Sequence, residues 1–109
     1  MIDTQHACNN GTGAMDYTFA PNKEFTFEEV RLHLNEYATA TENFVIQLQS
    51  SKGSAFNVKL YSKDMNGVQD IVYQPTKEHD IREEDSLKFT WPNTQSKTWG
   101  LEIIWKGAL

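Results

Sequence analysis

The sequence predicts an all-β protein, a single antiparallel β-sandwich that is jelly-roll-like and has seven or eight short strands. Apolar and aromatic residues recur at every second position in several short segments, which is the period of a strand with one buried face. Turn signals that contain Gly, Asn or Pro separate these segments. No segment sustains a helical period of apolar residues, so packed layers of strands are the favoured architecture.

The chain has 109 residues, the size of one domain, and a fold of this length buries roughly 65% of the surface that its unfolded chain exposes. We expect two parts, a flexible polar N-terminal arm at residues 1–14 and the sandwich at residues 15–109. The arm is rich in Asn and Gly and holds too little apolar surface to order itself. A loose tail is the favoured interpretation, and an arm that becomes ordered on a partner is the alternative.

The clearest pattern is a hairpin over residues 42–62. Apolar and polar residues alternate on both sides of a Gly- and Ser-containing connection at residues 50–54. The residues that we expect to face the core are Phe44, Ile46 and Leu48 before the connection and Phe56, Val58 and Leu60 after it. This spacing places one face of a sheet against the core and leaves the other face in solvent.

A strand over residues 25–34 changes phase within its length. Phe25 and Phe27 have one parity, whereas the apolar residues at 30–34 have the other. One extra residue near positions 28–29 would return all of them to a single face, which is what a β-bulge does. A short helix at the start of this segment is the alternative, but the strict alternation that follows favours the strand.

The other strands are predicted from the same alternation and from the breaks between them. They cover residues 15–20, 68–74, 86–91 and 98–106, and the charged residues 76–85 are expected to form a turn. Trp99 and Trp105 share the parity of the apolar residues in the last strand, so we expect both to pack in the core.

Charge and cysteine content exclude several classes of protein. The formal net charge is −5, and Lys and Arg are scattered, which disfavours binding to nucleic acid or to an anionic membrane surface. The one cysteine, Cys8, precludes an internal disulfide and favours folding in a reducing cytoplasm. The first residues do not resemble a signal peptide, and no apolar run approaches the roughly 20 residues that span a bilayer.

No constellation in the sequence predicts catalysis or a cofactor. His6 and Cys8 have a ligand-like spacing, but zinc needs about four ligands and no second pair accompanies them. The acidic residues at 78–85 lack the calcium-loop pattern and are expected to be solvated. His33 alternates with apolar residues and is expected on the surface. We therefore predict neither an enzyme nor a metal or cofactor site.

Three aromatic residues are candidates for contact with a partner. Trp91 precedes Pro92 at the mouth of a loop, and Tyr61 and Tyr73 lie near strand ends. An exposed ring beside a loop can stack on a sugar or anchor a protein interface. Packing at the edge of the core is the slightly favoured interpretation for each of the three, and partner contact is the alternative.

Residues 15–107 resemble small β-sandwich decoration proteins, also called cement or staple proteins, of short-tailed bacteriophage capsids. The segments that carry this resemblance are FEEVRLHL at 27–34, NFVIQL at 43–48, LYSKD at 60–64, DIVYQP at 70–75 and DSLKFTWPN at 85–93. The resemblance implies a non-enzymatic protein on the virion surface that binds the outside of an icosahedral shell and staples neighbouring capsid subunits together.

On this reading the partner is the major capsid protein, and the N-terminal arm becomes ordered against it. The partner-binding residues are then Met1, Ile2 and His6 in the arm, and Tyr61, Tyr73 and Trp91 at strand ends. A homodimer would suit a staple at a two-fold axis, because two-fold dimers are the commonest closed assembly. The alternative is a carbohydrate-binding module that binds a host-surface glycan through the same aromatics, since this fold serves both functions.

Overall fold

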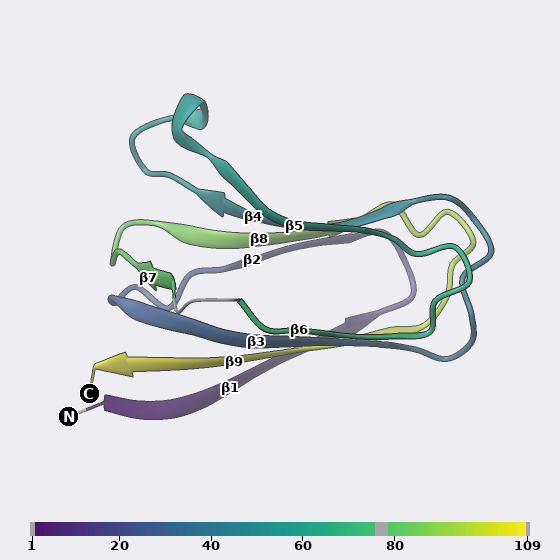
Figure 1. Cartoon of the computed structure of the whole chain (residues 1–109), viewed down its shortest axis with the longest axis horizontal. Helices are drawn as coiled ribbons and strands as arrows, with labels where there is room; N and C mark the ends of the chain where they lie inside the picture. The colour runs from purple at the N-terminus through teal and green to yellow at the C-terminus, as the bar shows by residue number, and fades with distance from the viewer. Residues whose placement is uncertain (1, 76–78, 109) are drawn as a thin grey trace.

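The computed structural model describes the backbone of residues 2–75 and 79–108, and it consists of two antiparallel sheets packed face to face (Figure 1). One sheet contains β1 (Ile2–Gly11), β9 (Trp99–Ala108), β3 (Phe25–Leu34) and β6 (Asp70–Tyr73) in that order, and β7 (His79–Ile81) pairs with β3 beside β6. The other contains β2 (Met15–Phe19), β8 (Ser86–Trp91), β4 (Asn43–Gln49) and β5 (Val58–Asp64), and a short 3-10 turn, η1 (Ser54–Phe56), precedes β5. The prediction of an all-β antiparallel sandwich is confirmed.

The strand orders β1-β9-β3-β6 and β2-β8-β4-β5 are those of a double-Greek-key jelly roll. The described chain has nine strands where seven or eight were predicted. One source of the difference is β7, which forms within the charged segment 76–85 that was predicted to be only a turn. Its central residue, Asp80, accepts a hydrogen bond from Thr26 Oγ1 on β3 at 3.0 Å. Residues 76–78 lie outside the described part.

The N-terminal segment differs most from expectation. Residues 2–11 form β1, which pairs with β9 in one unbroken register from Ile2 opposite Ala108 to Gly11 opposite Trp99. The prediction of a flexible arm is therefore wrong for these residues. The polar composition was a poor guide because backbone hydrogen bonds to a neighbouring strand can order a segment that buries few apolar side chains.

The bulge predicted in residues 25–34 is confirmed. The pairing of β3 with β9 shifts register between Phe27 and Glu29. The apolar side chains on both sides of the shift are buried: Phe25, Phe27, Val30, Leu32 and Leu34. The extra residue thus returns the second half of the strand to the core face, as the change of parity required.

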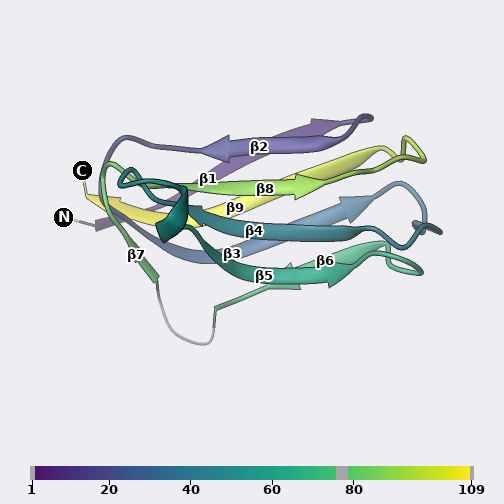
Figure 2. The same ribbon diagram turned by 90° about the horizontal axis from the view of Figure 1, so that it is seen from above.

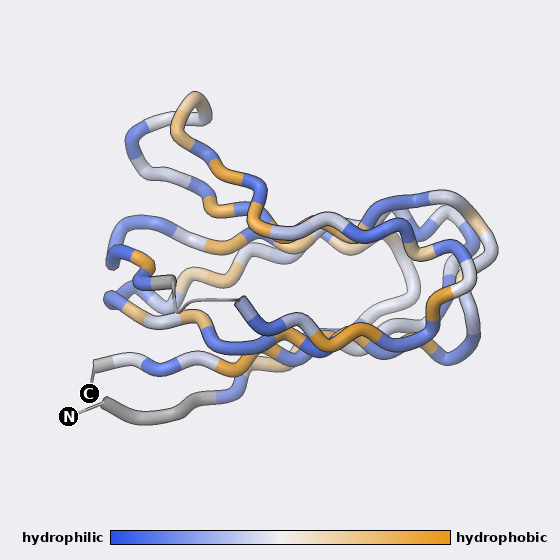
Figure 3. Tube along the Cα trace, in the orientation of Figure 1, coloured by the Kyte–Doolittle hydropathy of each residue, from blue (hydrophilic) through white to orange (hydrophobic). Residues whose placement is uncertain are grey.

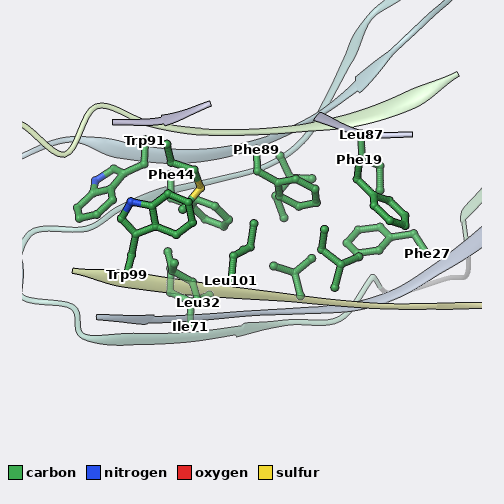
Figure 4. Packing of buried hydrophobic residues seen from close by; sticks show 14 of the residues in the cluster. Phe19, Phe27, Leu32, Phe44, Ile71, Leu87, Phe89, Trp91, Trp99 and Leu101 are labelled. Carbon is green, nitrogen blue, oxygen red and sulfur yellow. The ribbon is translucent and has the colours of Figure 1, made fainter. Parts of the chain in front are cut away.

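The core lies between the sheets and combines aromatic with aliphatic side chains (Figure 4). Phe44 on β4 and Phe89 on β8 stack with ring centroids 6.5 Å apart, and Phe19 meets Trp105 edge to face at 5.4 Å. Trp99 and Trp105 are both buried, which confirms the prediction made for them. Seen from above, β1 and β2 lie along one side of the sandwich and β5 and β6 along the other (Figure 2).

No helix in the described residues has the length and apolar character needed to cross a membrane.

Candidate attachment surface

The β4–β5 hairpin projects from the sandwich (Figure 1), and its projecting end includes hydrophobic positions (Figure 3). Phe56 is 62% exposed and Val58 is 48% exposed, although both were predicted to face the core. We refer to residues 50–58 as the hairpin tip. The tip bends away from the sheet that contains β3 and β6 (Figure 1), so that sheet does not cover it.

Hydrogen bonds brace the hairpin tip. Asn57 Nδ2 donates to Gln49 Oε1 at 2.9 Å, and Asn57 Oδ1 accepts from the Ser50 N–H at 2.7 Å. The Ser51 N–H donates to the Asp85 carboxylate at 2.9 Å, which ties the tip to the loop before β8. Gly53 has φ 125°, a conformation that residues other than glycine rarely adopt. The exposed apolar residues therefore sit on a preorganised support.

Tyr61 and Tyr73 contact each other across the open side of the sandwich. Their rings stack with centroids 4.3 Å apart, and Tyr73 O–H donates to the Leu60 carbonyl at 3.5 Å. Burial raises the pKa of the Tyr61 phenol, and the neighbouring Tyr73 adds to that rise. Both rings are half-buried, so they close the edge of the core and leave only part of each ring for contact with a partner.

Trp91 is not an exposed platform. Its side chain is 2% exposed and lies in the core among the labelled residues of Figure 4. Its parity with Leu87 and Phe89 on β8 directs the ring inward. The prediction that Trp91 contacts a partner is corrected for this reason. Trp91 Nε1 is buried and has no hydrogen-bond partner among the described residues.

A shallow depression of about 810 Å³ lies over the outer face of the sheet that contains β8, at the end where β8 finishes. The residues around it include Asp16, Glu42, Lys88 and Thr90, and Lys88 Nζ contacts the Asp16 carboxylate at 3.3 Å. Trp91, the one aromatic residue in the lining, is buried. The depression offers hydrogen-bonding groups but no exposed ring on which a sugar could stack.

The outer face of the other sheet holds a polar network around Glu29. This residue is 8% exposed, and its carboxylate accepts from Gln74 Nε2 and from Arg31 Nε, each at 2.5 Å. The hydrogen bond from Gln74, followed by that from Arg31, lowers the pKa of Glu29. Arg31 also approaches Glu102 at 3.5 Å, and Glu102 contacts His6 Nδ1 at 3.0 Å. The groups of this face are thus engaged with one another.

His6, His33 and Cys8 lie on this same outer face of the sheet. His6, Cys8 and His33 are exposed, and His33 pairs with Asp70 across β3 and β6. Among the described residues, no group of three or more His, Cys, Asp or Glu side chains converges on a point where a metal ion could bind. Met1 and the side chain of Ile2, both predicted to bind a partner, lie outside the described part.

Sequence reasoning missed the hairpin tip as a surface because it assigned Phe56 and Val58 to the core. The alternation of apolar residues correctly paired the strands of this hairpin, since β4 and β5 are antiparallel neighbours. No local signal in this hairpin identifies the tip, because the cover of an apolar face depends on where the opposite sheet lies.

Comparison with known proteins informs the fold alone. No protein-family model matches the chain, and no curated protein matches it. A similar solved structure is that of the Drosophila NLP core, whose crystal structure was presented as giving insight into pentamer formation and histone binding. The similarity covers 98% of each chain at a TM-score of 0.51, with 11% sequence identity. The chain is therefore similar in fold to the NLP core.

Proposed function

We propose that this chain is a non-enzymatic structural protein of a bacteriophage virion, which binds the outside of an icosahedral capsid and fastens neighbouring capsid subunits together. The observation that carries the proposal is the braced hairpin tip with Phe56 and Val58 exposed. The tip would act as the attachment element, and the major capsid protein would supply the apolar surface that receives it.

The physical basis is the low cost of binding through a support that is already ordered. Association must offset the entropy lost when loops and side chains become fixed, and a preorganised tip has less of this entropy to lose. Aromatic side chains at the centre of an interface commonly contribute most of its binding energy, so Phe56 is the expected anchor. The charged groups around Glu29 and Glu102 pair with one another and not with a free partner site, which favours a structural role for the outer face of the sheet that contains β3.

Co-sedimentation with purified phage particles tests this proposal. The particles come from the phage whose genome encodes the chain, and the amount of bound chain is compared between variants. The double substitution Phe56→Ser/Val58→Ser should reduce binding strongly. The matched control is Tyr37→Ser/Val72→Ser, because Tyr37 is 62% exposed and Val72 is 63% exposed, and both lie outside the hairpin tip. A wild-type chain that stays in the supernatant, or equal binding by both double variants, would contradict the proposal.

A second candidate is an oligomeric binder of basic proteins. The formal net charge of −5 and the fold shared with the NLP core favour it. Light scattering would then show a pentamer, and the chain would bind purified histones in a salt-dependent way. A smaller assembly without affinity for histones would remove this candidate. The glycan-binding alternative loses its main residue, because Trp91 is buried and cannot stack on a sugar from that position.

A further inference from the structure

The edge strands of the two sheets differ in how well they are protected against pairing with another chain. An edge strand presents a row of free backbone N–H and C=O groups, and natural proteins keep such edges short, charged or bulged. β2, β6 and β7 are short, with five, four and three residues. β5 has seven residues, but it carries Lys59 and Lys63 and its register with β4 shifts between Ile46 and Gln47.

β1 lacks all of these protections. It has ten residues, and its register with β9 is continuous over the whole strand. Its sequence, IDTQHACNNG, contains no Lys, Arg or Pro, and Asp3 is its one acidic residue. In the described part of the chain no strand pairs with its outer side, and Figure 2 places it at the margin of its sheet. A long, regular and nearly uncharged edge of this kind is a template for strand addition.

We propose that a second copy of this chain pairs with β1, antiparallel and about a two-fold axis, so that the two β1-containing sheets join into one continuous sheet. Such an interface uses the same strand of each copy and closes on itself, as two-fold dimers do. The interface would provide hydrogen-bond partners for the outward backbone N–H and C=O groups of β1 in both copies. The short or charged edge strands β2, β5, β6 and β7 would remain outside the interface.

The charges on β1 are compatible with self-pairing. Directly opposed residues of antiparallel strands have their side chains on the same face of the sheet. Neighbouring residues of one strand point to opposite faces, so the two-fold axis cannot lie between them. The axis must instead pass through one residue, which then lies opposite the same residue of the second copy. The longest overlaps place the axis at His6 or at Ala7. Asp3 then faces either Asn9 or Gly11 of the second copy, and no like charges oppose one another.

The other long edge is not compatible in the same way. If β5 paired with itself about its central residue, Tyr61, then Lys59 of one copy would face Lys63 of the other. Like charges directly opposed across strands are destabilising. This contrast identifies β1, and not β5, as the edge that a second copy would use.

The test measures the mass of the purified chain by light scattering and sedimentation equilibrium over a range of concentrations, with no capsid present. The wild type should reach twice the 12.5 kDa mass of one chain. His6→Lys/Cys8→Lys should raise the dimer dissociation constant at least about tenfold, because lysine then opposes lysine in both overlaps. With the axis at position 6, the new lysine at that position faces its own copy. With the axis at position 7, it faces the new lysine at position 8 of the second copy. Both positions are exposed on the outer face, and Lys at position 6 would place a positive charge beside Glu102.

The matched control is Ser54→Lys/Ser62→Lys, which adds the same number of charges to exposed positions on η1 and on the edge strand β5. It should leave the dimer unchanged. A chain that remains monomeric at all concentrations, or a dimer that both lysine pairs weaken equally, would overturn the proposal. Either result would leave the hairpin-tip attachment untouched, since that proposal is tested on particles and through different residues.

A cross-linking measurement tests the same interface without depending on lysine variants. In a Cys8→Ser background, a single cysteine is introduced by His6→Cys or Ala7→Cys, and the protein is oxidised. The variant whose cysteine lies on the axis should form an intermolecular disulfide, because only there are two Cβ atoms within bridging reach. Thr18→Cys in the same background serves as the control and should remain uncross-linked. Cross-linking at Thr18 but at neither β1 position would contradict the β1 interface.

Discussion

Tyr61 on β5 and Tyr73 on β6 stack with their ring centroids 4.3 Å apart and their planes at 26°, and so join the two sheets along the side opposite β1. β5 and β6 belong to different sheets, so no backbone ladder connects them. The aromatic pair supplies the contact that the ladder cannot, and the Tyr73 hydroxyl adds a hydrogen bond to the Leu60 carbonyl.

Removing one ring of this pair should destabilise the fold. We expect Tyr73→Ala to lower the free energy of unfolding by about 2 kcal/mol, less than for a fully buried ring because both tyrosines are half-buried. Urea denaturation followed by circular dichroism provides the measurement. Tyr37→Ala is the control, since that ring is exposed, and it should change the value by no more than about 0.5 kcal/mol. Equal losses in the two variants would show that the pair does not hold the sheets together.

The raised pKa of Tyr61 predicts a loss of stability at high pH. A phenol whose pKa is higher in the folded state than in the unfolded state stabilises the fold while it is protonated. This contribution is complete below the ordinary tyrosine pKa of 10.0 and is lost as the pH rises through the folded value. Tyr61→Phe should flatten the alkaline limb of the stability profile. Spectrophotometric titration of tyrosinate should also lose its highest-pH component in this variant, whereas Tyr37→Phe should retain it.

The lowered pKa of Glu29 predicts a loss of stability at low pH. Its pKa is lower in the folded state, so the carboxylate contributes stability above the ordinary value of 4.5, and that contribution is lost as the pH falls through the folded value. Glu29→Gln should cost about 1 kcal/mol near neutral pH, because the charge-assisted hydrogen bonds from Arg31 and Gln74 weaken. The variant should also lose less stability than the wild type on acidification. A parallel acid limb for Glu29→Gln and wild type would contradict this assignment.

Two buried tryptophans allow a matched comparison. Trp99 Nε1 donates to the Gly13 carbonyl at 2.9 Å, whereas Trp91 Nε1 has no acceptor in the described part of the chain. Trp→Phe removes similar volume at both positions, but at Trp99 it also breaks a hydrogen bond. We expect Trp99→Phe to destabilise the protein by about 1 kcal/mol more than Trp91→Phe in urea denaturation. A larger loss at Trp91 would indicate that its indole N–H is satisfied in solution.

Several elements could be predicted from local pattern because they depend on one strand at a time. The bulge between Phe27 and Glu29 followed from the change of parity within a single segment. The inward positions of Trp99 and Trp105 likewise followed from alternation along the last strand. In each case burial is a property of the face, and the face is set by a period of two.

The attachment surface and the β1 edge could not be predicted in this way. Val58 has the parity of a core residue, but it is exposed because the hairpin bends away from the sheet that contains β3 and β6. Residues 2–11 look disordered by composition, yet the backbone of β9 orders them. Trp91 is a different case, because its parity with Leu87 and Phe89 already indicated an inward ring, and the structure buries it.

Alternating apolar residues and turn residues act within one segment, so they were enough to predict the all-β sandwich, the bulge in residues 25–34 and the inward face of the final strand. They could not predict which apolar faces are covered or which strand edges stay open. Burial of a face and pairing of an edge both depend on the length and position of a different strand, which no local pattern in the sequence records.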